Sequence, residues 1–212
     1  MIKGVIFDLD GVIVSTDDLH YKAWKKMADK ENIPFDKTIN NRLRGISRMA
    51  SLNIILEKSE KTYSEEEKKD LTDFKNTYYR ELLETLSKED ILPGIMDILT
   101  ALKEAGIKLA IGSSSKNAKK ILKKIELLEI FDAISDGTDI THSKPHPEVF
   151  LVAANKLELL PINLAVVEDA KSGIQAAKKA RMLAFATGDA KDSEEKDHDF
   201  EALLDVVLKD HK

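Results

Sequence analysis

The chain has 212 residues, 42% of them hydrophobic and 33% charged, a balance typical of a globular protein rather than a disordered one. Its formal net charge of −5 argues against a nucleic-acid-binding surface, and the absence of cysteine excludes disulfides, thiolate catalysis and cysteine metal sites. No apolar stretch approaches the ~18 residues of a membrane span, and no leader pattern precedes the first strand. We therefore expect a cytoplasmic protein that has neither a membrane nor a nucleic-acid partner.

The first predicted element is a short buried strand over residues 2–7, followed directly by Asp8-Leu9-Asp10-Gly11-Val12. Side chains two positions apart on an extended backbone point to the same side, so Asp8 and Asp10 face one point beyond the strand. Two adjacent anions repel unless a cation or a shared proton relieves them, and Mg²⁺ is a common cation at such sites. Alternatively the segment is a polar turn in which Gly11 supplies a positive φ. The pair alone does not decide between these two interpretations.

Residues 17–86 are predicted to form several amphipathic helices, because apolar residues recur there at spacings of three and four without a strand signal. Ser47 and Ser64 are suitable N-caps, and Ser64-Glu65-Glu66-Glu67 matches a capping box.

Beyond Pro93-Gly94 the chain alternates helices and strands. The predicted helices are 95–104, 116–127, 148–156, 170–180 and 200–208, and the predicted strands are 107–111, 131–134, 164–167 and 183–186. This alternation predicts an α/β fold with a doubly wound, Rossmann-like parallel sheet and helices on both faces. We expect residues 1–14 and 89–212 to form this core and residues 15–88 to form an inserted all-helical cap domain. No clear strand precedes the last helix, which leaves that edge of the sheet undefined.

Ligands of such sheets bind beyond the carboxyl ends of the strands, and polar clusters of this chain fall at those ends. The clusters are Asp8 with Asp10, Ser113 to Ser115, Lys144, and Glu168 with Asp169. Together they suit phosphoryl transfer, in which Asp8 or Asp10 attacks phosphorus and Asp8 and Asp169 hold Mg²⁺. Ser113 can bind phosphate oxygens, and Lys144 can offset the concentrated negative charge.

Each cluster also has a purely structural interpretation. The serines can cap a helix, Lys144 can be a solvated loop lysine, and Glu168-Asp169 can begin a helix. Because all the clusters are predicted at one edge of the sheet, we favour the site.

Four stretches resemble the motifs of haloacid dehalogenase-type phosphotransferases, in their order and spacing, across nearly the whole chain. They are Asp8-x-Asp10-Gly-Val, Ser113, Lys144-Pro145-x-Pro147-x-x-Phe150 and Glu168-Asp169. The resemblance implies that Asp8 is the phosphorylated nucleophile. It implies that Asp10 is the general acid/base and gives its backbone carbonyl to Mg²⁺. Glu168 and Asp169 complete the implied metal site.

Further stretches resemble those members of the superfamily that interconvert β-glucose 1-phosphate and glucose 6-phosphate. They are Thr16, His20-Tyr-Lys-Ala-Trp24, Arg44-Gly45-Ile46-Ser47-Arg48, Lys75-Asn76 and Ser113-Ser-Ser-Lys116-Asn117. The resemblance implies that Arg48 holds the phosphate that is not being transferred, flanked by Ser115, Lys116 and Asn117.

The same resemblance assigns His20, Gly45 and Lys75 to the substrate-contacting surface of the cap, and Thr16 to its hinge. Trp24 fits either a substrate contact or, better, the cap core, while His20 can also be a plain surface residue. Position 15 is serine where the family usually has aspartate, which bears on the hinge rather than on the nucleophile.

The sequence therefore predicts a Mg²⁺-dependent mutase that acts on a small phosphorylated sugar, through an aspartyl-phosphate and a glucose 1,6-bisphosphate, as a monomer. A cap that excludes water suits a mutase, because an aspartyl-phosphate is easily hydrolysed. The alternatives are a sugar-phosphate hydrolase with the same aspartates and, from another class, a catalytically silent scaffold.

Overall fold

A computed structural model describes residues 1–43 and 46–209 of the chain. The chain divides into two compact units, one comprising Met1–Ser15 and Ser87–Lys212 and the other Thr16–Leu86. Among the described residues, no helix combines the length and the apolar character that crossing a bilayer requires.

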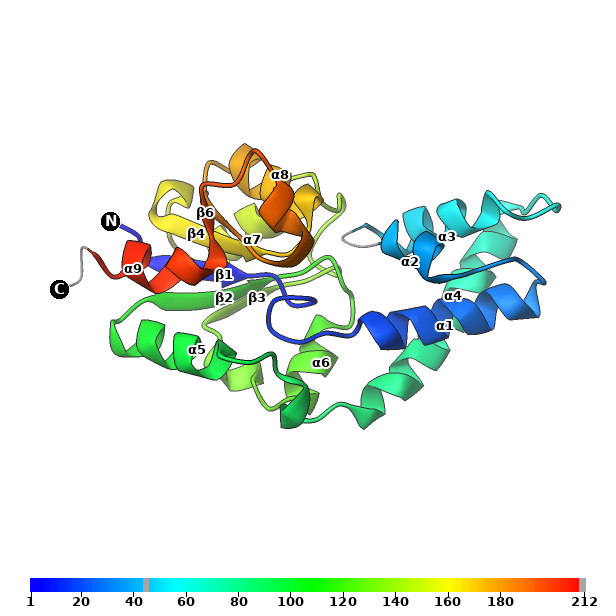
Figure 1. The fold of residues 1–212 in the computed structure, drawn as a ribbon, viewed down its shortest axis with the longest axis horizontal. Coiled ribbons are helices and arrows are strands. Elements are labelled where there is room, and N and C mark those ends of the chain that lie inside the picture. The colour runs from blue at the N-terminus through cyan, green and yellow to red at the C-terminus, as the bar shows by residue number, and fades with distance from the viewer. Residues whose placement is uncertain (44–45, 210–212) are drawn as a thin grey trace. The chain divides into compact units, whose positions relative to one another are not determined.

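The first unit is built on a six-stranded sheet (Figure 1). Its strands are β1 (Gly4–Phe7), β2 (Lys108–Gly112), β3 (Ala133–Ser135), β4 (Leu164–Glu168), β5 (Leu183–Ala186) and β6 (His198–Asp199). Their order is β3-β2-β1-β4-β5-β6, and every neighbouring pair is parallel. The predicted doubly wound parallel sheet is therefore confirmed, and β6 is the edge strand that the sequence pattern did not reveal.

Helices cover both faces of this sheet (Figure 1). They are α5 (Ile95–Glu104), α6 (Ala118–Lys124), α7 (Glu148–Leu157), α8 (Lys171–Lys179) and α9 (Leu203–Val207). Helices α7 and α8 pack on one face, where Ile6, Val149 and Phe150 belong to one buried apolar cluster. A Cβ on Gly112 would lie 2.7 Å from the Phe150 ring, so glycine allows α7 to approach β2 closely.

The second unit is helical and contains its own apolar core, which includes Trp24, Met27 and Leu52. Its helices are α1 (Asp17–Lys30), α2 (Lys37–Asn41), α3 (Arg48–Leu56) and α4 (Glu65–Leu82). Ser47 caps α3 and Ser64 caps α4, the latter through the predicted capping box with Glu67.

Because the strands are parallel, their carboxyl ends lie along one edge of the sheet. Asp8 follows β1, Ser113 follows β2, Asp136 follows β3, and Glu168 is the last residue of β4. This edge gathers the polar residues of the candidate site.

Candidate active site

Three carboxylates lie together at the ends of the central strands. Asp8 continues β1, and its backbone N–H donates to the Val167 carbonyl at 2.9 Å. Its side chain lies close to those of Glu168 and Asp169, such that one oxygen of each lies within 4.8 Å of the others. Asp8 is 7% exposed and Glu168 only 1%, so this is a buried cluster of anionic groups.

Lys144 reaches this cluster from the loop between β3 and α7. Its Nζ donates to Asp8 Oδ1 and to Glu168 Oε1, and the residue is 5% exposed. Burial alone would lower the pKa of Lys144, but the charges of Asp8 and Glu168 outweigh that effect and raise it. Lys144 is therefore a fixed positive charge in contact with the predicted nucleophile.

One lysine does not balance three carboxylates. Burial raises the pKa of Asp8 to about 7, with Glu168 adding to the shift and Lys144 opposing it. Burial also raises the pKa of Asp169 to about 8, and the charges of Asp8 and Glu168 contribute. Raised pKa values show that further positive charge is favoured here. A hard divalent cation that prefers oxygen ligands, such as Mg²⁺, fits this donor set.

Two glycines make room for the carboxylates. Gly11 has a φ of +81°, and a Cβ there would lie 2.0 Å from an oxygen of Asp169. At Gly173, in the first turn of α8, a Cβ would lie 1.9 Å from the Glu168 carboxyl carbon. Gly11 was recognised in the sequence only as a turn residue and Gly173 was missed. A small residue shortly after Glu-Asp was the available signal.

The segment after β2 presents hydroxyl groups near the strand end. Ser113 is 3% exposed, its N–H donates to the Ser135 carbonyl at 3.0 Å, and its Oγ accepts from the Ser115 N–H at 3.1 Å. Ser115 Oγ in turn accepts from the Asn117 N–H at 3.1 Å, while Lys116 is exposed. Since Ser113 Oγ is an acceptor in this turn, its own O–H can donate to a ligand.

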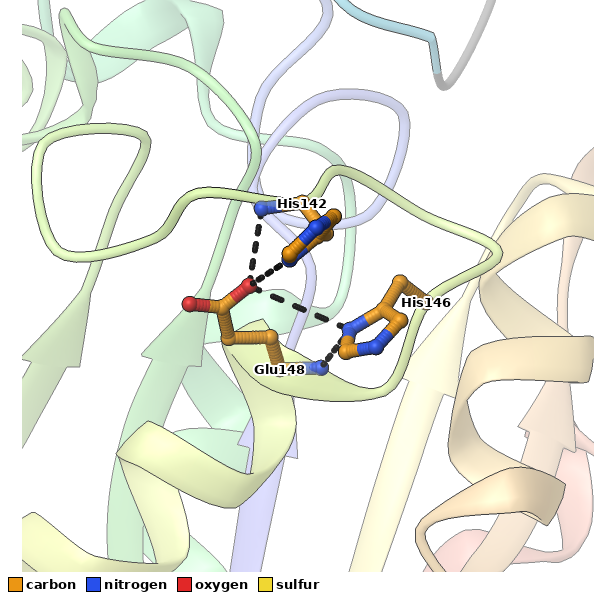
Figure 2. A group of neighbouring side chains, drawn as sticks. All are labelled: His142, His146 and Glu148. Carbon is orange, nitrogen blue, oxygen red and sulfur yellow. Dashed lines mark hydrogen bonds and ion pairs between the residues drawn. The ribbon is translucent and has the colours of Figure 1, made fainter.

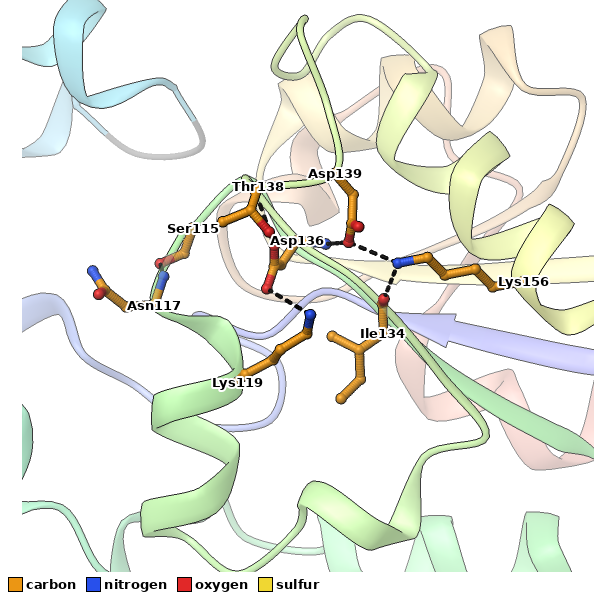
Figure 3. Close-up of polar contacts among 8 residues, drawn as sticks. All are labelled: Ser115, Asn117, Lys119, Ile134, Asp136, Thr138, Asp139 and Lys156. Atoms are coloured by element: carbon orange, nitrogen blue, oxygen red, sulfur yellow. Dashed lines mark hydrogen bonds and ion pairs between the residues drawn. The ribbon is translucent and has the colours of Figure 1, made fainter.

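A polar network secures the start of the segment that leads from β3 to Lys144 (Figure 3). The buried Asp136 carboxylate accepts from the N–H and the hydroxyl of Thr138, at 2.8 and 2.6 Å. Asp139 accepts from the Asp136 N–H at 3.0 Å and from Lys156 Nζ at 2.7 Å. Sequence reasoning missed these residues, although the bonds among Asp136, Thr138 and Asp139 are local; only the contact with Lys156 depends on the fold.

In the helical unit, four of the predicted site residues are gathered with Tyr79. Lys75 is only 2% exposed, and its Nζ lies 2.9 Å from His20 Nδ1 and 4.3 Å from the centre of the Tyr79 ring. His20 stacks on Tyr79, whose hydroxyl is hydrogen bonded to Thr16 Oγ1 at 2.9 Å. Trp24 is 2% exposed within the core, 4.8 Å from Lys75 Nζ. The sequence did not single out Tyr79.

The remaining predicted residues take separate positions. Arg48 is half-buried at the start of α3, where burial lowers its pKa against the opposing charges of Asp73 and Tyr79. Asp10 forms an isolated bridge with Val14 after β1. Gly45 lies outside the described residues.

Comparisons with known proteins identify the family of the chain. A family model described as haloacid dehalogenase-like hydrolase matches residues 5–187. The chain is 46% identical over 189 residues to a β-phosphoglucomutase of Bacillus subtilis, an alignment that spans 88% of this chain and 84% of that protein. It is 33% identical to a phosphorylated carbohydrates phosphatase of Thermotoga maritima, over 84% of this chain and 82% of that one.

Among solved structures, a β-phosphoglucomutase from Clostridium difficile superimposes with a TM-score of 0.90 at 39% identity, over 99% of this chain and 98% of that one. The resemblance to the haloacid dehalogenase family and the expectation of an enzyme are thereby confirmed. With the family model covering most of the sequence and the relatives aligned along nearly all of it, the chain belongs to the haloacid dehalogenase-like hydrolase family.

Proposed function

We propose that the protein is a Mg²⁺-dependent mutase that interconverts β-glucose 1-phosphate and glucose 6-phosphate, as a monomer in the cytoplasm. The observation that carries phosphoryl transfer is the buried group of Asp8, Glu168 and Asp169 with Lys144 in contact with Asp8. The choice of a mutase is supported by the likeness to two β-phosphoglucomutases along almost the full chain.

In this proposal an Asp8 carboxylate oxygen forms a bond to phosphorus while the bond from phosphorus to the sugar oxygen breaks. Asp10 gives a proton to the departing sugar oxygen, and it takes a proton from the sugar hydroxyl that attacks the aspartyl-phosphate in the reverse sense. The 1,6-bisphosphate formed in this way turns end over end between the two transfers. The cycle begins and ends with phosphorylated Asp8, which the 1,6-bisphosphate supplies at the start: the sugar hydroxyl takes the phosphate from Asp8, and free Asp8 then takes the phosphate at the other end of the bisphosphate, so atoms and charges balance.

The neighbouring side chains stabilise charge. Lys144 opposes the raised pKa of Asp8 and so favours the ionised form that acts as nucleophile, and the Ser113 hydroxyl donates to a phosphate oxygen. When bound by the carboxylates and the Asp10 carbonyl, Mg²⁺ offsets the charge of the transferring phosphate. Arg48 is the proposed anchor of the second phosphate, because a guanidinium binds phosphate in a bidentate manner; Ser115, Lys116 and Asn117 are proposed as further ligands of that phosphate.

Hydrolysis of a sugar phosphate is the second candidate, since several relatives are named phosphatases, including a fructose-1-phosphate phosphatase of Escherichia coli at 29% identity. The buried Lys75, in contact with the partly buried His20, favours a mutase, because burying a lysine in the helical unit is costly unless it binds a second part of the substrate. A hydrolase that acts on one phosphate has less need of a second set of phosphate-binding residues.

One assay separates the candidates. The protein is supplied with β-glucose 1-phosphate, Mg²⁺ and a trace of the 1,6-bisphosphate, and glucose 6-phosphate and inorganic phosphate are measured in parallel. A mutase forms the sugar phosphate, a hydrolase releases phosphate, and a scaffold does neither. Asp8→Asn should abolish either activity. Substantial turnover by Asp8→Asn would exclude the aspartyl-phosphate route, and unchanged turnover by Arg48→Ala would exclude the second anchor.

A further inference from the structure

A second group of potential metal ligands lies on the loop that carries Lys144. Within the described residues, His142, His146 and Glu148 form a cluster in which one ligand atom of each lies within 4.8 Å of the others. Figure 2 shows both imidazoles turned toward the same carboxylate oxygen of Glu148. Nδ1 of His142 lies 3.1 Å from Glu148 Oε2, and Nδ1 of His146 lies 3.9 Å from it.

We propose that these three residues bind a divalent transition-metal ion of the Zn²⁺ class, at a site separate from the Mg²⁺ site. Two imidazoles and one carboxylate are a ligand set that Zn²⁺, Ni²⁺ and Cu²⁺ prefer, whereas Mg²⁺ prefers oxygen alone. Three protein ligands leave the fourth position of a tetrahedral ion to water.

The spacing of the ligand atoms suits such an ion. Zn²⁺ with bonds of about 2.0–2.1 Å in tetrahedral geometry holds its ligands about 3.3 Å apart. The separations of 3.1 and 3.9 Å from Glu148 Oε2 lie on either side of that value, so small side-chain rotations suffice. The His142 and His146 side chains are 64% and 51% exposed, so an ion reaches them directly from solvent.

The backbone orients the carboxylate. Glu148 Oε1 accepts from the Thr141 N–H at 3.0 Å and Oε2 accepts from the His142 N–H at 2.7 Å. A carboxylate oxygen has two lone pairs, so it can keep an amide hydrogen bond and still bind a metal ion. Hydrogen bonds of this kind fix the orientation of metal ligands in known sites. The Glu148 N–H donates to His146 Nδ1 at 3.3 Å, and because this nitrogen has a single lone pair, a bound ion would replace that long hydrogen bond.

Two backbone amides hold the Glu148 carboxylate, whereas each imidazole has one long hydrogen bond to Glu148, at 3.1 Å for His142 and 3.3 Å for His146. The two bonds to Thr141 and His142 amides need only the carboxylate, yet two imidazoles lie over it with their ring centres 4.7 Å apart. Their common direction toward one oxygen is the observation that favours an ion.

The test is a Zn²⁺ titration of the metal-free full chain by calorimetry, in excess Mg²⁺ so that the carboxylate cluster is occupied. The wild type should bind a single equivalent of Zn²⁺. His142→Ala and His146→Ala should each weaken binding at least about tenfold, the loss expected on removing a ligand. His198→Gln is the matched control and should bind as the wild type does. Absence of saturable Zn²⁺ binding, or equal affinity in the wild type and both alanine variants, would overturn the proposal.

Two further measurements guard against misfolded variants. Glu148→Gln keeps the length of the side chain and an oxygen for the Thr141 amide, and it should still weaken Zn²⁺ binding. Zn²⁺ should raise the Tm of the wild type and of His198→Gln but not that of His146→Ala, because only an ion bound to the folded state stabilises it. An equal Tm increase in His146→Ala would place the ion elsewhere.

Discussion

Replacing Lys144 by methionine removes the ammonium from contact with Asp8 and Glu168 while keeping a side chain of similar length. The Lys144 side chain is 3% exposed, and those of its two partners are 10% and 1% exposed. Removing one member of a buried ion pair commonly costs about 3–5 kcal/mol of unfolding free energy, because the other charge stays buried and unpaired. The free energy of unfolding of Lys144→Met should therefore be much lower than that of the wild type at any pH at which Asp8 is ionised.

The loss should depend on pH, with a definite sign. In the metal-free wild type the pKa of Asp8 is raised to about 7, above its unfolded value of 3.8. Because the pKa of the Asp8 carboxyl is higher in the folded state, the folded state binds more protons than the unfolded state between pH 3.8 and about 7. The stability that this protonation supplies is therefore lost as the pH rises toward 7. Without Lys144 the pKa rises further, and the variant continues to lose stability above pH 7. One proton corresponds to about 1.4 kcal/mol per pH unit, so the gap should widen above pH 7 at up to about that rate until the pKa of Asp8 in the variant is passed.

Urea unfolding of both proteins in a chelator, at steps of pH from about 6 to 9, measures this gap. Lys156→Met is the matched control, because Lys156 also pairs with an aspartate, Asp139 at 2.7 Å, but its side chain is 35% exposed. Exposed pairs contribute about 0–1 kcal/mol, so the control curve should run parallel to the wild type. A Lys144→Met curve that is also parallel to the wild type would refute the coupling of Lys144 to ionised Asp8.

Three other outcomes follow from the same geometry. Mg²⁺ affinity should fall as the pH drops below about 8, because protons then compete with the ion for Asp8 and Asp169, whose pKa values are about 7 and about 8. Calorimetric titrations that give equal Mg²⁺ affinity at low and high pH would contradict this expectation. Gly173→Ala should displace the Glu168 carboxylate and weaken Mg²⁺ binding about tenfold. The free energy of unfolding should change little, because alanine favours the helix. Unchanged Mg²⁺ binding would show that the carboxylate moves freely. Ser64→Ala should cost about 1 kcal/mol in urea unfolding through loss of the capping box, and no measurable cost would show that this cap is dispensable.

The placement of residues at strand ends followed from sequence with few assumptions. Asp8, Ser113 and Glu168 each come directly at or after a short apolar run, and a parallel sheet brings the ends of such runs to one edge. The burial of Lys144 could not be predicted in this way. Lysine is usually exposed, and its contact with Asp8 joins residues far apart in the chain.

Helix α4 illustrates what an apolar pattern misses. The spacing of Leu71, Phe74 and Tyr78 correctly indicated an amphipathic helix, yet the fully buried positions on its inner face include Lys75 and Tyr79. A pattern of apolar residues assigns lysine to the solvent face, because it has no knowledge of the rings and the histidine that surround the ammonium.

Strand β6 escaped detection for a simpler reason. It has two residues, both polar, so it carries no alternation of apolar and polar positions. Asp197 precedes it, accepting from the Ala184 N–H through its side chain at 2.8 Å and donating its own N–H to the Ala184 carbonyl at 2.9 Å. Pairing of this kind rests on contacts between separate segments, which local sequence does not encode.

The position of β1 in the sheet also has a consequence for how the chain folds. This strand lies between β2 and β4, and Gly4 pairs with both Lys108 and Leu164. Strand β1 is therefore synthesised about a hundred residues before β2 and still further before β4, whereas the helical unit between β1 and β2 is continuous in sequence and has its own apolar core. Non-local pairings of this kind slow folding and leave a hydrophobic strand exposed to misassembly in the meantime. The segment that carries the predicted nucleophile should thus reach its native partners only after the helical unit has been synthesised.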